Sequence, residues 1–262
     1  MSARSRLLLT LSLTALVLVG CATAPETGRS QLLLIDTAEE AQLGFKSFEQ
    51  IKRETPVARN PAESKRLQEV GERIAAVVNL PHAQWEFVLF ESDQPNAFAL
   101  PGGKIGVYTG ILPLTRTDAG LATVLAHEIA HATARHGAER MSQGLLVQVG
   151  GVALSTALGG QSAVSQELAT QAYGLTTQLG VMLPYSRVQE LEADRIGLLY
   201  MARAGYDPAE AIGFWQRFQA YSQSRGGQGL EFLSTHPLDD TRIAQIQRFL
   251  PQAQAEYARA RR

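Results

Sequence analysis

The chain has 262 residues, with 24 basic and 25 acidic side chains, so its formal net charge is −1. This balance argues against nucleic-acid binding, which requires a clustered basic surface. Hydrophobic residues make up 45% of the chain, enough for one substantial core, and no internal repeat is visible. A single cysteine excludes a disulfide within the chain.

Residues 1–20 have the pattern of a secretory signal peptide. Arg4 and Arg6 precede the apolar run 7–19, which is too short to span a bilayer comfortably. The run ends at Gly20 and is followed by Cys21, a pattern that resembles a bacterial lipobox. Cleavage before the cysteine would leave it ready for acylation, and several acyl chains give stable membrane anchoring. We therefore expect a lipoprotein.

Residues 21–30 are small and polar, and we expect them to be a lipidated, flexible tether. The remaining residues, 31–262, are expected to form one folded domain. Ala22 follows the cysteine, and by resemblance to bacterial lipoproteins the absence of Asp there favours the outer membrane. The expected location is therefore the periplasmic face of the outer membrane, reached through lipidated Cys21.

Two helices and a small sheet are predicted in the first part of the domain. Cap residues and prolines indicate helices over residues 36–53 and 61–78. The alternation in residues 85–90 predicts a strand. Residues 96–109 predict a hairpin around Pro101-Gly102-Gly103, and the proline places this hairpin at a sheet edge.

The pentapeptide His127-Glu128-Ile129-Ala130-His131 lies in a helix predicted from about Thr117 to His136. Positions i and i+4 are about 40° apart around a helix, so His127 and His131 present their imidazoles on one face. Two such imidazoles suit Zn²⁺, which keeps an open position in catalytic sites. Glu128 projects about 100° away, where a general base for an attacking water must stand.

That pentapeptide alone could also be a solvated helix face with chance histidines. Small apolar neighbours instead indicate a buried helix, in which polar groups without partners are costly. Glu190 and Asp194 follow downstream, one helical turn apart. Glu190 is the candidate third ligand, and Asp194 could hold a ligating histidine from behind. Together these residues predict a metal-activated hydrolase.

Residues 141–183 are rich in Gly, Ala and Leu, yet no apolar run reaches about twenty residues, so a membrane span is not predicted. Two interpretations stay open: a pair of packed helices, which we favour, or a mobile or membrane-facing flap. Further helices are predicted over residues 206–223 and at the C-terminus, with a flexible break at residues 226–229.

Three segments now carry a family resemblance. Residues 96–103, 127–131 and 186–194 resemble the motifs of the HtpX-like and BepA-like zinc metallopeptidases, a gluzincin group that includes the C-a-a-X prenyl proteases and the mitochondrial Oma-type peptidases. The resemblance covers residues 30–250, and no motif position is substituted. It implies one zinc ion per chain, with the following roles: ligands His127, His131 and Glu190, base Glu128, and supporting carboxylate Asp194.

The resemblance also implies how substrate binds. Gluzincins hold an extended peptide antiparallel to an edge strand beside the zinc. The residues that match this strand are Asn96, Ala97, Phe98 and Ala99. A plain structural hairpin is the alternative.

His236 precedes Pro237, which favours an extended conformation in a loop before the last helix. Its segment resembles a late motif close to zinc in this family. Two roles stay open. His236 could stabilise an oxyanion with help from Arg242, or it could occupy the fourth zinc position in a resting state.

These inferences converge on an α+β, mostly helical gluzincin domain with a small edge sheet beside the active-site helix. The expected function is that of a membrane-anchored periplasmic zinc metalloendopeptidase in protein quality control, with misfolded or misassembled envelope proteins as substrates. A chaperone or assembly factor with secondary proteolysis is the alternative, and the intact Glu128 argues against a purely binding role. The oligomeric state and the cleavage specificity are not predicted.

Overall fold

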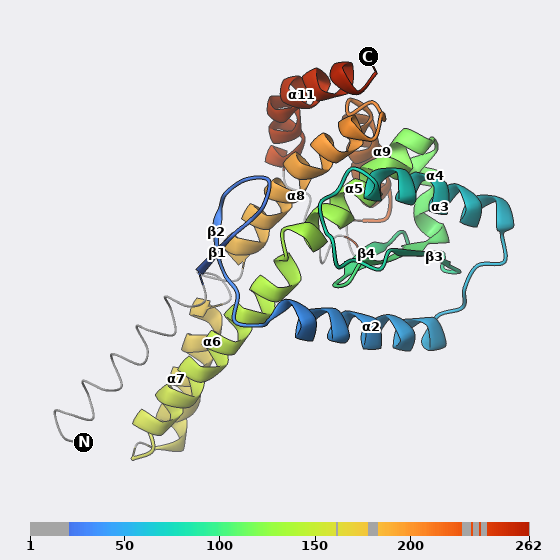
Figure 1. Ribbon diagram of the computed structural model, residues 1–262. Helices are drawn as coiled ribbons and strands as arrows, with labels where there is room; N and C mark the ends of the chain where they lie inside the picture. The colour runs from blue at the N-terminus through green and yellow to red at the C-terminus, as the bar shows by residue number, and fades with distance from the viewer. Residues whose placement is uncertain are drawn as a thin grey trace. The chain divides into compact units, whose positions relative to one another are not determined.

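The computed structural model describes residues 21–160, 162–177, 183–226, 232, 236 and 240–261 (Figure 1). The predicted signal peptide, residues 1–20, lies outside this part. The predicted mostly helical α+β fold with a small sheet is confirmed. The elements are β1 (Cys21–Thr23), β2 (Ser30–Leu32), α2 (Thr37–Glu54), α3 (Pro61–Ala75), β3 (Glu86–Phe90), β4 (Ala97–Leu100), β5 (Lys104–Tyr108), the short 3-10 helix η1 (Thr109–Ile111), α4 (Leu112–Thr115), α5 (Asp118–Thr133), α6 (His136–Ala157), α7 (Ala163–Thr177), α8 (Leu183–Arg203), α9 (Glu210–Ser224) and α11 (Asp240–Ala260).

The chain divides into two compact units. One combines Met1–Thr37 with Arg135–Ser186, and the other combines Ala38–Ala134 with Arg187–Arg262. We call them the hairpin unit and the catalytic unit. Their boundaries differ from those predicted for the tether and the folded domain, which stay a prediction.

The sheet of the catalytic unit has the strand order β3-β5-β4. Strand β5 pairs in parallel with β3 and antiparallel with β4. Successive side chains of a strand point to opposite faces, so Phe87 packs on Gly71 of α3 while Phe90 meets the ring of Phe48 on α2. Helix α2 therefore covers one face, and α3 with α5 cover the other (Figure 1).

The predicted hairpin is confirmed, and its strand β4 lies at the sheet edge. The turn that connects β4 to β5 requires glycine, because Gly102 and Gly103 have φ angles of +83° and +87°. The turn also approaches α2 closely: a Cβ added to Gly44 would clash with the carbonyl oxygen of Pro101. The hairpin is thereby fixed against the helix that covers it.

In the hairpin unit, β1 and β2 form an antiparallel pair, so residues 21–23 and 30–32 are strands within the segment whose composition predicted a flexible tether. Arg29 holds this segment in place, because its guanidinium donates two hydrogen bonds, of 2.8 and 2.7 Å, to the buried carboxylate of Glu139 on α6. The backbone N–H of Leu34 adds a 2.9 Å hydrogen bond to Ser142 Oγ on the same helix.

Helices α6 and α7 form the packed pair that was the favoured interpretation of residues 141–183. The hydroxyl of Tyr173 donates a 2.9 Å hydrogen bond to the carbonyl of Val147, which ties the two helices together. Among the described helices, none combines the length and the apolar character needed to cross a bilayer.

Candidate metal centre

Helix α5 carries the first part of the site. It starts at the N-cap Thr117, whose hydroxyl oxygen accepts a 3.0 Å hydrogen bond from the N–H of Gly120. It ends at Thr133, short of the predicted His136, because Arg135 adopts a left-handed φ of 55° and a new helix begins there. The helix is buried along almost its whole length, so its polar side chains need partners.

Helix α8 brings Glu190 and Asp194 to the same place. These residues lie on adjacent turns of one face. Close approach to α5 depends on Gly197: a Cβ there would lie 3.1 Å from the backbone nitrogen of His127 and 3.2 Å from the carbonyl carbon of Ala126. The missing side chain therefore lets the two helices pack nearly backbone to backbone.

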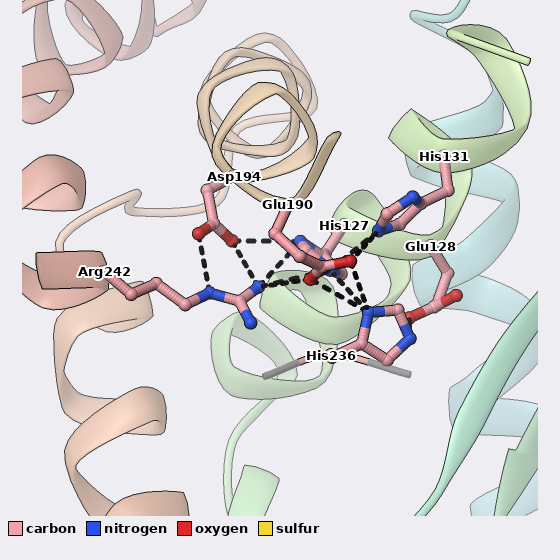
Figure 2. Close-up of polar contacts among 7 residues, drawn as sticks. All are labelled: His127, Glu128, His131, Glu190, Asp194, His236 and Arg242. Carbon is pink, nitrogen blue, oxygen red and sulfur yellow. Dashed lines mark hydrogen bonds and ion pairs between the residues drawn. The ribbon is translucent and has the colours of Figure 1, made fainter. Parts of the chain in front are cut away.

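Four buried side chains converge on one point, as Figure 2 shows. The Nε2 atoms of His127 and His131 are 3.1 Å apart. Glu190 Oε2 lies 3.2 Å from the first of these nitrogens, and Glu190 Oε1 lies 3.2 Å from the second. His236 Nδ1 is 3.0 Å from Glu190 Oε2 and 3.2 Å from His127 Nε2.

This donor set suits zinc. Tetrahedral ligands with bonds of about 2.0–2.1 Å lie roughly 3.3 Å from one another, slightly more than the separations seen here. Three imidazole nitrogens and one carboxylate oxygen match the borderline-soft ligands that zinc prefers. The four groups are at most 6% exposed, and four such polar groups held together in an apolar core would otherwise be costly.

A layer of contacts behind the ligands fixes their orientation (Figure 2). Asp194 Oδ1 lies 3.0 Å from His127 Nδ1, which leaves Nε2 of that ring for the metal. Arg242 donates two hydrogen bonds, of 2.7 and 2.8 Å, to the same aspartate, and its Nη2 atom lies 3.3 Å from Glu190 Oε2. The Arg242 guanidinium carbon lies over the ring of Trp215, 3.7 Å from its centroid.

These contacts keep the carboxylates charged. Burial opposes charge on Asp194, yet the Arg242 guanidinium and the His127 imidazole outweigh it and lower the pKa of Asp194. Burial opposes charge on Glu190 as well, but the nearby imidazoles, His236 foremost, hold its pKa well below the ordinary value. Both groups are thus anionic at neutral pH.

Among the protein groups alone, His127 favours the imidazolium. Burial disfavours that charge, but Asp194 and Glu190 outweigh it and raise the pKa of His127 to about 9. Metal ligation needs the neutral ring, so occupation of the site by a cation requires loss of this proton.

Glu128 stands beside the donor cluster. Burial, the largest influence, raises the pKa of its carboxyl group, although the imidazoles of His236 and His127 favour the charged form. The backbone N–H of Ala99 donates a hydrogen bond to this carboxylate. Its Oε1 atom is buried and accepts no hydrogen bond from any described residue, although His236 Nε2 lies 3.3 Å away. A raised pKa and an acceptor left open suit a base that takes a proton from water.

Strand β4 connects Glu128 to the sheet edge. The N–H of Tyr108 donates to the carbonyl of Asn96, so this pair is hydrogen-bonded within the sheet. Hydrogen-bonded and non-bonded positions alternate in an antiparallel pair, which turns the backbone groups of Ala97 and Ala99 to the edge. The N–H of Ala99 points to Glu128 accordingly. The structure thus brings the predicted substrate-binding strand beside the predicted base.

Comparison with known proteins gives the lineage of this site. Residues 61–250 match peptidase family M48. The chain belongs to this family. It is 40% identical over 184 residues to the mitochondrial metalloendopeptidase OMA1 of Schizosaccharomyces pombe, and 34% identical over 251 residues to the protein of the same name from Saccharomyces cerevisiae. It is also 30% identical over 233 residues to the beta-barrel assembly-enhancing protease of Escherichia coli.

These alignments cover different shares of each protein. They include 70%, 89% and 85% of this chain, respectively, but 52%, 70% and 46% of the three relatives. The chain thus spans about half of the fission yeast and bacterial proteins. At the level of the family, the predictions of an Oma-type and BepA-like resemblance, of a metallopeptidase and of a zinc cofactor are confirmed.

The structure adds two residues that the sequence did not indicate. Trp215 supports Arg242 and also meets the edge of the His127 ring, with centroids 5.8 Å apart. Phe232 stacks on Trp215 and lies 4.5 Å from the His236 ring, centroid to centroid. Neither residue belongs to a short motif, so only the packing reveals them.

Arg242 was predicted to assist oxyanion stabilisation. Its contacts to Asp194 and Glu190 indicate a positioning role, and the oxyanion role stays a prediction. His236 lies within the donor set, and the rest of its predicted loop, residues 233–235 and 237–239, falls outside the described residues.

Proposed function

We propose that the chain is a zinc metalloendopeptidase that hydrolyses peptide bonds in misfolded or misassembled proteins of the bacterial envelope. One observation carries the hydrolytic part: three imidazoles and a carboxylate converge within reach of one cation. Beside them lies Glu128, whose Oε1 atom accepts no hydrogen bond from the described residues.

The residues divide the chemistry among them. When bound, zinc supplies a Lewis acid that polarises the scissile carbonyl and lowers the pKa of water. Glu128 takes a proton from water while the oxygen of that water attacks the carbonyl carbon. The carbon–nitrogen bond then breaks, and Glu128 returns the proton to the leaving amine. Asp194 and Arg242 keep the His127 ring in the required orientation throughout.

Substrate recognition is proposed to use the backbone. The edge-facing backbone groups of Ala97 and the carbonyl of Ala99 offer hydrogen bonds to an extended peptide, so recognition depends on main chain more than on side chains. Unfolded segments satisfy this requirement, because folded proteins rarely offer an unpaired extended strand. The name of the bacterial relative, a beta-barrel assembly-enhancing protease, supports envelope proteins as the substrate class.

Casein digestion tests the activity. The purified chain should degrade casein and lose this activity with a zinc chelator, whereas a pure chaperone would bind casein without cleaving it. Glu128→Gln should retain bound substrate, and mass spectrometry of proteins captured from envelope extracts would identify them. Chelator-resistant cleavage would contradict a zinc mechanism.

We further propose that lipidated Cys21 anchors the chain to the outer membrane, facing the periplasm. The lipobox-like pattern supports this location, whereas the names of the yeast relatives indicate mitochondria for those proteins. Cys21→Ser should abolish labelling by radioactive palmitate and change the membrane fractionation. Identical fractionation and no label in the parent protein would contradict lipid anchoring.

A further inference from the structure

Helix α6 of the hairpin unit exposes an unusual number of large apolar side chains. We call these five residues the α6 stripe: Met141, Leu145, Leu146, Val149 and Val152. They are between 36% and 63% exposed. At about 100° per residue, they fall within one half of the helix surface. The opposite half faces α7, where Tyr173 bonds to Val147 and fills the space beside Gly150.

The segment around the α6 stripe is almost free of charge. Between Arg140 and Arg187, Glu167 is the single charged residue, although charged residues make up 19% of the chain. An exposed apolar face of this kind marks a surface that contacts a protein or a membrane. Protein contacts are enriched in aromatic residues, methionine and arginine, and of these the stripe contains only Met141.

The stripe is also fastened to the start of the mature chain. Arg29 lies between β1 and β2, and Leu34 follows β2; they donate hydrogen bonds to Glu139 and Ser142 near the beginning of α6. Strand β1 begins at Cys21, and both features belong to the hairpin unit. A lipid attached at the cysteine would therefore hold this unit at a membrane surface.

We propose that the α6 stripe lies in the interfacial layer of the lipid bilayer, as a second membrane contact beside the acyl chains of Cys21. This inference rests on the proposed lipid anchor for its setting. Since no described helix can span a bilayer, the stripe inserts its side chains from one side. Because the stripe carries no basic residues, neutral lipids are sufficient for the contact.

Site-specific fluorescence tests this contact in the lipidated protein. Cys21 is the single cysteine, and its acylated sulfur cannot react, so one introduced cysteine is labelled selectively. Leu145→Cys and Val149→Cys receive a polarity-sensitive dye. The matched controls in the catalytic unit are Leu43→Cys and Val57→Cys, where the native side chains are similarly exposed at 42% and 51%.

Each protein is reconstituted into phosphatidylcholine vesicles with nitroxide-labelled acyl chains. We expect strong quenching at the two stripe positions and at least about threefold less at the controls, because nitroxides in the acyl region quench only dyes that lie near them. Equal quenching at all four positions overturns the inference. Dye emission that resists nitroxide but shifts upon dilution with unlabelled chain assigns the stripe to self-association and also overturns it.

Two controls separate this inference from the proposed function. Labelling of the parent protein would reveal a free Cys21 and contradict the anchor; the quenching measurement is then repeated with Cys21→Ser chains added to vesicles. Casein hydrolysis by the labelled variants reports proteolysis independently. The triple variant Leu145→Gln, Val149→Gln, Val152→Gln should lose at least about tenfold in vesicle partitioning without lipidation and keep casein hydrolysis. A raised KM for casein with unchanged partitioning would make the stripe a substrate surface instead.

Discussion

At the scale of single residues, replacing a zinc ligand and replacing the general base should have different effects on zinc binding and turnover. Glu190→Ala should abolish both casein hydrolysis and stoichiometric zinc binding, because the carboxylate lies beside the Nε2 atoms of both His127 and His131. Glu128→Gln should keep zinc and lose about 10²- to 10⁴-fold in turnover, the usual contribution of a general base. Metal analysis and casein kinetics on the same preparations separate the two effects.

Each variant has an outcome that contradicts its assignment. A full equivalent of tightly bound zinc in Glu190→Ala would remove this residue from the ligand set. Normal turnover in Glu128→Gln would show that another group accepts the proton. Glu167→Gln, which lies far along the sequence in the charge-poor segment and is exposed, serves as a neutral control for both.

His236 has two predicted roles, and its geometry favours one of them. Its Nδ1 atom is 3.0 Å from Glu190 and completes a four-donor set, the arrangement expected of a resting ligand. His236→Ala should therefore raise basal casein hydrolysis, since water gains access to the fourth position. An oxyanion donor would instead lose roughly a hundredfold or more in kcat. Unchanged activity together with unchanged zinc affinity would defeat both roles.

The sequence predicted the residues of the site only where short spacing dictates geometry. His127 and His131 had to share a helical face, and so did Glu190 and Asp194. Trp215 and Phe232 contact the same cluster through long-range packing, which leaves no local pattern. Residues that support a site from distant helices are therefore found by structure rather than by motif.

At the scale of elements, the meeting of α8 with α5 depends on Gly197. In Gly197→Ala the new Cβ would meet backbone atoms of Ala126 and His127 at 3.1–3.3 Å, closer than most Cβ contacts. The helices must then shift by a few tenths of an ångström, which moves Glu190 relative to the histidines. We expect weaker zinc binding, measured by chelator competition, and a lower temperature of unfolding.

Gly144→Ala on α6 is the matched control for this substitution. No atom lies within 4 Å of the added Cβ, and alanine favours a helix over glycine by up to about 1 kcal/mol. This variant should unfold at the same or a higher temperature and bind zinc normally. If both variants bound zinc like the parent, close packing at Gly197 would not control the site.

The predicted elements show where local signals end. Pro101-Gly102-Gly103 predicted the hairpin correctly, because the turn needs positive φ angles. The parallel pairing of β3 with β5 joins strands separated by β4, and no local pattern encodes it. The active-site helix was predicted too long, because the left-handed residue that ends it is an arginine, Arg135, and not the glycine that usually signals such a conformation.

At the scale of the whole molecule, composition alone did not predict that the segment after residue 20 forms paired strands. Residues 21–30 are small and polar, which predicted a flexible tether. The Arg29–Glu139 pair instead links this segment to a helix more than a hundred residues away. Only the tertiary partner reveals that Arg29 is a structural residue.

The metal should also stabilise the fold, because its four donors come from α5, α8 and the segment before α11. A ligand that binds the native state alone stabilises it by about 2.7 kcal/mol at a hundredfold excess over Kd. For a chain of this size, each 1 kcal/mol changes Tm by about 2–4 °C, so chelation should lower Tm by roughly 5 °C or more. Calorimetry with and without chelator measures this difference.

The same measurement on two variants distinguishes a metal effect from chelator damage. Glu128→Gln retains the donors, so its Tm should fall with chelator as much as in the parent protein. Glu190→Ala lacks one donor, and its Tm should be nearly insensitive to chelator. An equal fall in Glu190→Ala would mean that the chelator acts elsewhere. An unchanged Tm in the parent protein would mean that α5 and α8 stay packed without the metal, through the close contact at Gly197 and the Arg242–Asp194 ion pair.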